Sequence, residues 1–147
     1  MSEQEKFRFN ISEKHTAMLS EPLLARLATA SLPEGQPHVV PVWYQWDGER
    51  LWISSYRSTR KIRILEQNPR CAVVVDQVTG SGEISGVLFE GLAELVRAPS
   101  DFLVRKTAEI YTRYLGEEGV QAPDPQEWMH SPENLLIRVS PSKVYAW

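Results

Sequence analysis

Four serine or threonine side chains and four cations lie within the ten residues from Ser54 to Arg63. This segment, SSYRSTRKIR, stands where a predicted strand is followed by a predicted helix. A helix N-terminus carries a partial positive charge, so acidic residues are favoured there and Lys and Arg are favoured at the other end. The first acidic residue after the cations is Glu66. A bound anion would make this arrangement favourable, and the segment therefore predicts a phosphate site.

The predicted phosphate contacts come from both ends of this segment. Ser55 and Ser58 offer hydroxyl groups, and Arg60 and Lys61 offer charge in the first turn of the helix. A charge-assisted hydrogen bond is worth about 1.5–3 kcal/mol, so three or four of them would hold a phosphomonoester firmly. The alternative is a solvated basic helix face that pairs with Glu66 or with acidic residues elsewhere.

The strand expected over His38–Trp46 lies beside this site. Asp47-Gly48 predicts a tight hairpin to the next strand, Arg50–Tyr56. Pro41 removes one backbone donor, which places the strand at an edge or a bulge. Backbone groups of Pro41, Val42 and Trp43 are therefore expected next to whatever extends from the phosphate. Ordinary core packing is the alternative for the valine side chains.

Side chains that do chemistry without a cofactor are not grouped in this sequence. His15, His38 and His130 lie in different segments, with no carboxylate at metal-ligand spacing, so no metal site is expected. Cys71 stands alone in an apolar run and is expected to be buried and inert. No serine has a glycine-flanked elbow. A phosphate site without acid–base residues suits a cofactor that supplies its own reactivity.

The expected elements indicate a mainly β protein with short helices, in one domain over residues 1–147. About six strands, mostly neighbours in sequence, predict an antiparallel sheet closed into a split β-barrel, because closure removes exposed edges. The other expected elements are a helix Glu13–Ser20 after Ser12, a strand Leu23–Ser31, a helix from Ser58 to about Gln67, strands Cys71–Gln77 and Val87–Val96 with a bulge at Gly91, a helix Asp101–Leu115 capped by Ser100, a loop Gly116–Pro132, and a last strand Leu135–Trp147 interrupted near Pro141.

Composition limits the partners. The formal net charge of -3 argues against a nucleic-acid binder, so the basic cluster points to one small anion. The charged start, Met1–Asn10, has no apolar segment for secretion or membrane spanning. Together with a single cysteine, this favours a cytoplasmic protein without a membrane partner. Five Trp and five Tyr favour a flat aromatic ligand or an oligomer interface.

The order of these motifs resembles a known family. A strand with P-V-W is followed by a D-G hairpin, a strand ending in S-S-Y, then S-T-R-K, then L-E-Q-N-P-R and an apolar strand. This pattern resembles the pyridoxamine 5'-phosphate oxidase-like superfamily, the FMN-binding split β-barrels. The resemblance covers about residues 23–77, and the terminal V-S-P-S-K-V-Y-A-W resembles the closing strand of smaller members.

The resemblance implies a homodimer with two FMN sites at the subunit interface and a small-molecule substrate. It assigns the FMN phosphate to Ser55, Ser58, Arg60 and Lys61. It places the isoalloxazine along Pro41, Val42 and Trp43, and it turns Ser54 toward the ribityl chain or the ring.

This sequence also departs from the true oxidase. Val39 and Val40 stand where the oxidase has an arginine, and its C-terminal Arg/His pair is not evident, so oxidation of pyridoxamine phosphate is not expected. The expectation is an FMN-dependent oxidoreductase acting on an unidentified small molecule. One alternative is a deazaflavin-dependent reductase, whose cofactor has a longer anionic tail that Arg57 and Arg63 could bind. The other is a non-enzymatic flavin- or haem-binding protein.

Overall fold

The computed structural model describes residues 9–97 and 99–147. Within them the chain forms one seven-stranded antiparallel sheet and four helices. The strands are β1 (Ala25–Ser31), β2 (Gln36–Val42), β3 (Tyr44–Trp46), β4 (Leu51–Tyr56), β5 (Arg70–Val78), β6 (Ile84–Arg97) and β7 (Asn134–Ala146). The helices are α2 (Glu13–Ser20), α3 (Arg60–Gln67), α4 (Asp101–Gly119) and α5 (Pro123–His130).

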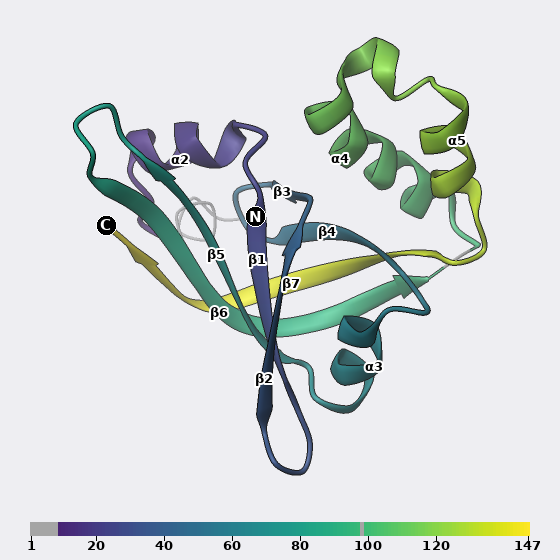
Figure 1. The fold of residues 1–147 in the computed structure, drawn as a ribbon, viewed down its shortest axis with the longest axis horizontal. Helices are drawn as coiled ribbons and strands as arrows, with labels where there is room; N and C mark the ends of the chain where they lie inside the picture. Colours follow the sequence, from purple (N-terminus) through teal and green to yellow (C-terminus); the bar gives the residue numbers. More distant parts are fainter. Residues whose placement is uncertain (1–8, 98) are drawn as a thin grey trace, which may run out of the picture.

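The strand order β2-β1-β5-β6-β7-β4-β3 explains why the sheet curls. Strands β2 and β3 lie at opposite edges, yet only Trp43 separates them in the chain. The two edges must therefore meet at this residue, and the Ser54 amide donates to the Trp43 carbonyl at 3.4 Å. Figure 1 shows the sheet wrapped around itself, with α4 and α5 side by side outside it.

The expected split barrel is confirmed, but the strand count is corrected. The strand expected over His38–Trp46 is two strands, because the chain changes from one edge of the sheet to the other at Trp43. This raises the count from about six to seven. Pro41 lies in β2, whose outer side has no strand partner, as expected for an edge.

The barrel interior is filled by alternate residues of the strands. Leu27, Val73 and Phe89 lie opposite one another across β1, β5 and β6, and all three are fully buried. Helices α2 and α3 add Leu19 and Ile62 to the same core. Full burial of such a side chain contributes about 1.5–3 kcal/mol, so packing rather than propensity holds these short helices in place.

The bulge expected at Gly91 is confirmed. The β6–β7 register shifts between Glu90 and Gly91, opposite Pro141. A Cβ atom on Gly91 would collide with the backbone carbonyl of Ser140 and would lie 2.8 Å from the Cα of Pro141. The missing side chain therefore lets two backbones approach closely where the long strands bend. The last strand runs through Pro141 without a break.

The segment expected as a loop over Gly116–Pro132 is mostly helical. Gly116 leaves helical geometry, with φ 80° and ψ 170°, but the helix resumes after it up to Gly119. Helix α5 then begins with Pro123. The prolines of this segment suggested a loop. Proline is nevertheless favoured in the first turn of a helix, because backbone N–H groups in that turn have no partner inside the helix and the missing N–H of proline costs nothing there.

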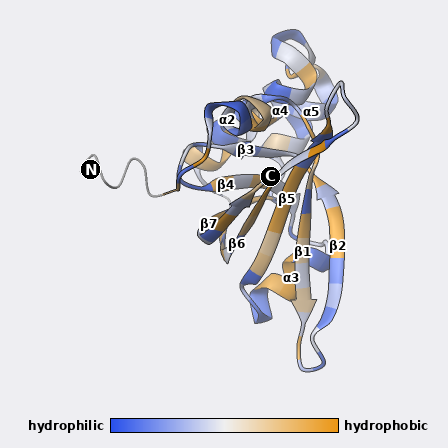
Figure 2. Ribbon diagram, turned by 90° about the vertical axis from the view of Figure 1, so that its left-hand side faces the viewer, coloured by the Kyte–Doolittle hydropathy of each residue, from blue (hydrophilic) through white to orange (hydrophobic). Residues whose placement is uncertain are grey.

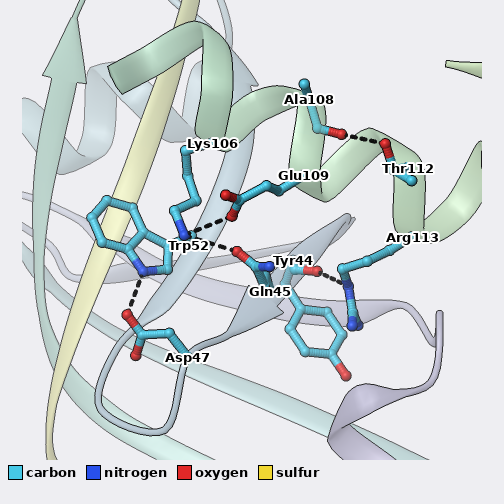
Figure 3. Close-up of polar contacts among 9 residues, drawn as sticks. All are labelled: Tyr44, Gln45, Asp47, Trp52, Lys106, Ala108, Glu109, Thr112 and Arg113. Atoms are coloured by element: carbon cyan, nitrogen blue, oxygen red, sulfur yellow. Dashed lines mark hydrogen bonds and ion pairs between the residues drawn. The ribbon is translucent and has the colours of Figure 1, made fainter. Parts of the chain in front are cut away.

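Side chains of α4 attach this helix to the barrel. The Arg113 guanidinium donates four hydrogen bonds of 2.9–3.3 Å to backbone carbonyls. One acceptor is Tyr44, and the other three lie at the end of α2 and are Leu19, Ser20 and Glu21. A guanidinium is favourable at a helix C-terminus, where free carbonyls gather. Figure 3 shows Arg113 reaching Tyr44.

The Asp47-Gly48 hairpin is confirmed, and Asp47 organises it. One carboxylate oxygen accepts the amides of Glu49 and Arg50, and the other accepts the Trp52 indole N–H at 2.8 Å. Lys106 of α4 lies 5.2 Å from the centre of the Trp52 ring (Figure 3).

None of the helices in the described ranges is long and apolar enough to cross a membrane.

Candidate functional site

The predicted phosphate site lies at the N-terminus of α3. Thr59 is the N-cap residue, but its side chain makes no capping hydrogen bond, and the first turn contains no acidic residue. The first backbone amides of a helix have no partner inside it. The start of α3 thus combines free donors with positive charge, which is the arrangement that binds anions.

The expected cap at Ser58 is wrong by one residue. Helix α3 starts one residue later than a Ser58 cap requires, so Thr59 takes the cap position and Ser58 is exposed. The Thr59 hydroxyl donates to the Tyr56 carbonyl at 2.9 Å and lies 3.4 Å from the Ser55 hydroxyl. Thr59 is therefore a site residue that the sequence analysis missed. The adjacent Ser-Thr pair was the only signal that could have found it.

The four cations of this segment have no acidic partners in the part of the chain that the structure describes. Arg57, Arg60 and Arg63 are exposed, and Lys61 is half-buried. Glu66, the partner proposed by the alternative, instead pairs with Arg97 at 3.2 Å. The pairing with Glu66 that the alternative expected is therefore not present. The Arg63 guanidinium donates to the Ser58 carbonyl at 3.2 Å, and none of the four cations is neutralised by a described carboxylate.

Lys61 is the cation whose environment is least favourable without a ligand. Burial lowers the pKa of its ammonium group, because desolvation disfavours the charged form. No carboxylate among the described residues lies close enough to form a salt bridge with it. A phosphate beside Lys61 would oppose this effect and favour the protonated form.

Replacing Lys61 tests this interpretation. Without cofactor at about pH 7, Lys61→Met is expected to increase the free energy of unfolding, because the partly buried charge is gone. The gain should shrink as the pH rises through the lowered pKa of Lys61, since the native lysine then loses its proton before the unfolded one does. Urea unfolding across this range measures the effect, with the exposed Lys14→Met as control. Equal gains in both variants would contradict it.

The residues expected along the cofactor ring lie where the barrel closes. Val42 is buried in the core, as the packing alternative for its side chain predicts. Trp43 stacks on Tyr114, with ring centroids 4.7 Å apart and an interplanar angle of 7°. The Trp43 ring is thus engaged by α4, and the backbone around Pro41 is what this segment can offer to a ligand.

The structure brings the two halves of the predicted site together. Ser54 donates its amide to Trp43, and Ser55, the next residue on β4, lies within reach of Thr59. Half-buried Ser54 and buried Ser55 therefore connect the ring segment to the start of α3. The side chains of these consecutive strand residues point to opposite faces of β4, so it is the backbone of Ser54 and the hydroxyl of Ser55 that bring the two halves together.

Comparison with known proteins shows the family of this chain. The family model described as pyridoxamine 5'-phosphate oxidase matches residues 11–147. The chain belongs to the pyridoxamine 5'-phosphate oxidase family. No curated protein matches the chain.

Solved structures of this family's fold include two at more than 25% identity. The conserved hypothetical protein Rv2991 from Mycobacterium tuberculosis is 29% identical, with a TM-score of 0.75, over 93% of this chain and 84% of that protein. An F420 reductase is 26% identical, with a TM-score of 0.70, over 92% of this chain and 98% of its own. The heme storage protein HutZ from Vibrio cholerae shares the fold; it is 18% identical, with a TM-score of 0.70, over 88% of this chain and 89% of that protein.

This member of the pyridoxamine 5'-phosphate oxidase family carries a second feature beside the site that the sequence analysis missed. The phenol of Tyr56, one residue after Ser55, interacts with the phenol of Tyr111 on α4. Burial raises the pKa of both phenols, so both stay protonated at neutral pH. Tyr111 also meets Trp43 and Trp128 edge-on, at 5.7 and 6.3 Å between ring centroids. The abundance of Trp and Tyr favoured a flat ligand or an oligomer interface in the sequence, whereas these rings contact one another in the structure.

Proposed function

We propose that this protein is an oxidoreductase that binds a flavin-type cofactor by its phosphate at the N-terminus of α3. The observation that carries the proposal is the start of α3 itself, uncapped and surrounded by four cations that have no acidic partner among the described residues. Such a cofactor supplies hydride transfer when bound. The chain's own part is to hold the cofactor, orient it and exclude water.

Each predicted residue has a place in this proposal. Ser55, Thr59, Arg60 and Lys61 would bind the phosphate together with the free amides of α3, and exposed Ser58 would contact it from outside. Half-buried Ser54 would face the ribityl chain. The backbone of Pro41, Val42 and Trp43 would run along the ring.

Of the two candidate cofactors, the deazaflavin F420 has the stronger support. An F420 reductase, whose name states its cofactor, is 26% identical to this chain, and the match covers 98% of that protein. Exposed Arg57 and Arg63 flank the start of α3 and could bind the longer anionic tail. FMN, the first expectation from the sequence, is the second candidate, since it requires only the phosphate contacts.

A cofactor titration tests the proposal. The purified protein is first examined by visible absorption spectroscopy, and FMN and F420 are then titrated into the cofactor-free form. We expect saturable binding of F420, FMN or both through the phosphate, with F420 the tighter ligand. A haem absorption band in the purified protein, or no binding of either cofactor, would contradict the proposal.

We also propose that the protein forms a homodimer through the outer face of its sheet. Val74, Leu88 and Tyr145 lie in one row across β5, β6 and β7 by their register. Ala28 and Val39 form a neighbouring apolar pair on β1 and β2, where Figure 2 also shows apolar stretches. Val39 is 64% exposed and Tyr145 is 47% exposed, which is unfavourable for an uncovered surface.

A charge on this face is expected to separate the subunits. Tyr145→Asp should convert a dimer into a monomer, because an aspartate in an apolar interface would be desolvated without a partner. Analytical ultracentrifugation measures the mass, and Glu83→Gln, at an exposed position before β6, serves as the control. A wild-type monomer, or a Tyr145→Asp variant that stays dimeric, would rule out this interface.

A further inference from the structure

A pocket of about 410 Å³ lies between the start of α4 and the end of α5. Its apolar walls include Leu103 and Val104 from α4 and Met129 from α5. Arg57, which follows β4, forms another wall. This volume lies in the range of small-molecule sites, which combine apolar walls with a few polar groups.

Arg57 supplies a guanidinium group to this pocket. Its backbone amide donates to the Glu133 carbonyl at 2.9 Å, which holds the residue in place. Its guanidinium takes part in none of the ion pairs formed by residues 9–97 and 99–147. A guanidinium of this kind suits a carboxylate, which it can bind through two parallel hydrogen bonds.

His130 supplies a second polar group. Its Nδ1 lies 2.8 Å from the Gln126 carbonyl, which can only accept, so Nδ1 carries the proton. In the neutral ring, Nε2 is then an acceptor. The two serines of the pocket are already engaged, Ser100 with the Leu103 amide and Ser131 with the Glu133 amide.

Asp101 limits the charge of a ligand. This exposed carboxylate also lines the pocket and would repel a second anionic group. Its own position in the first turn of α4 is favourable to the helix, so it needs no cation from the pocket.

From these groups we propose that this pocket is a binding site for a small aromatic monocarboxylic acid. The carboxylate binds Arg57, the flat apolar body packs on Leu103, Val104 and Met129, and His130 accepts from a ligand hydroxyl or amine. The site is distinct from the start of α3, although Arg57 borders both regions. An F420 tail bound to Arg57 would compete with this ligand for the guanidinium, whereas FMN, which requires only the phosphate contacts, would leave it free.

The proposal is tested with a matched pair of probes, 2-naphthoate and its neutral analogue 2-naphthamide. Each is titrated into the full-length protein and followed by amide chemical shifts in two-dimensional NMR. We expect 2-naphthoate to shift resonances of α4 and α5 around the pocket, and to bind about tenfold or more tightly than 2-naphthamide, since one charge-assisted hydrogen bond is worth that much. Equal affinities, or shifts confined to other regions, would overturn the proposal.

Variants separate the charge from the cavity. Arg57→Gln should remove the preference for 2-naphthoate, whereas Arg105→Gln, an equal charge loss on the exposed side of α4, should keep it. Val104→Trp should fill the pocket and weaken both probes. Because Arg57 is exposed, its variant is expected to fold even if the pocket-filling variant does not. A preference that survives Arg57→Gln would contradict the assigned carboxylate contact.

Discussion

Replacing both Arg60 and Lys61 with alanine is expected to weaken cofactor binding by about 10²- to 10⁴-fold. Two charge-assisted hydrogen bonds are lost, each worth about 1.5–3 kcal/mol, and about 1.4 kcal/mol corresponds to a factor of ten. The cofactor-free double variant should unfold at nearly the same urea concentration as the wild type, because Lys61→Ala removes the partly buried charge but, unlike Lys61→Met, also removes the packing of the side chain's apolar stem, and these two effects oppose each other. Neither side chain forms an ion pair with a described residue, and Arg60 is exposed.

Fluorescence titration of FMN and of F420 into both proteins measures this loss. A Lys14→Ala/Arg105→Ala double variant removes the same charge from exposed positions outside the proposed site. It should bind as the wild type does, apart from a small long-range effect that salt screens. If the two double variants lose affinity equally, the contribution of Arg60 and Lys61 is general electrostatics and the phosphate assignment fails.

The second large effect is expected for stability. Gly91→Ala should lower the free energy of unfolding by about 3 kcal/mol, at the upper end of the cost of overpacking. The new methyl group would collide with the backbone of Ser140 and Pro141, which cannot turn aside as a flexible side chain can. The β6–β7 pairing at the bulge would have to separate.

Urea unfolding followed by tryptophan fluorescence measures this change. Gly80→Ala provides the matched control, because a Cβ atom there meets nothing within 4 Å. Its free energy of unfolding should stay within about 0.5 kcal/mol of the wild type, as is usual for surface substitutions. A Gly91→Ala variant as stable as this control would show that the two strands can move apart without cost.

Features that depend on neighbouring residues were predictable from the sequence. Ser12 caps α2 and Ser100 caps α4, as expected, because a hydroxyl satisfies the free amides of the next helical turn. The Asp47-Gly48 hairpin and the bulge at Gly91 also follow from local backbone chemistry. The excess of cations at the start of α3 is another feature that could be read from neighbouring residues, since a helix dipole acts within a single turn.

Contacts between distant segments were not predictable in this way. The run of β-branched and aromatic residues over 38–46 continues through Trp43 and contains no sign that the strand changes edges there, because that step is required only by closure of the barrel. In the same way, packing between α4 and α5 buries Tyr111 and Met129, with Trp43 partly buried against them, and stabilises a proline-rich segment as helix α5. Local residue chemistry thus specifies where charge and turns occur. Burial of apolar surface across the whole chain specifies which of these places meet, since the free energy of that burial depends on partners far away in sequence.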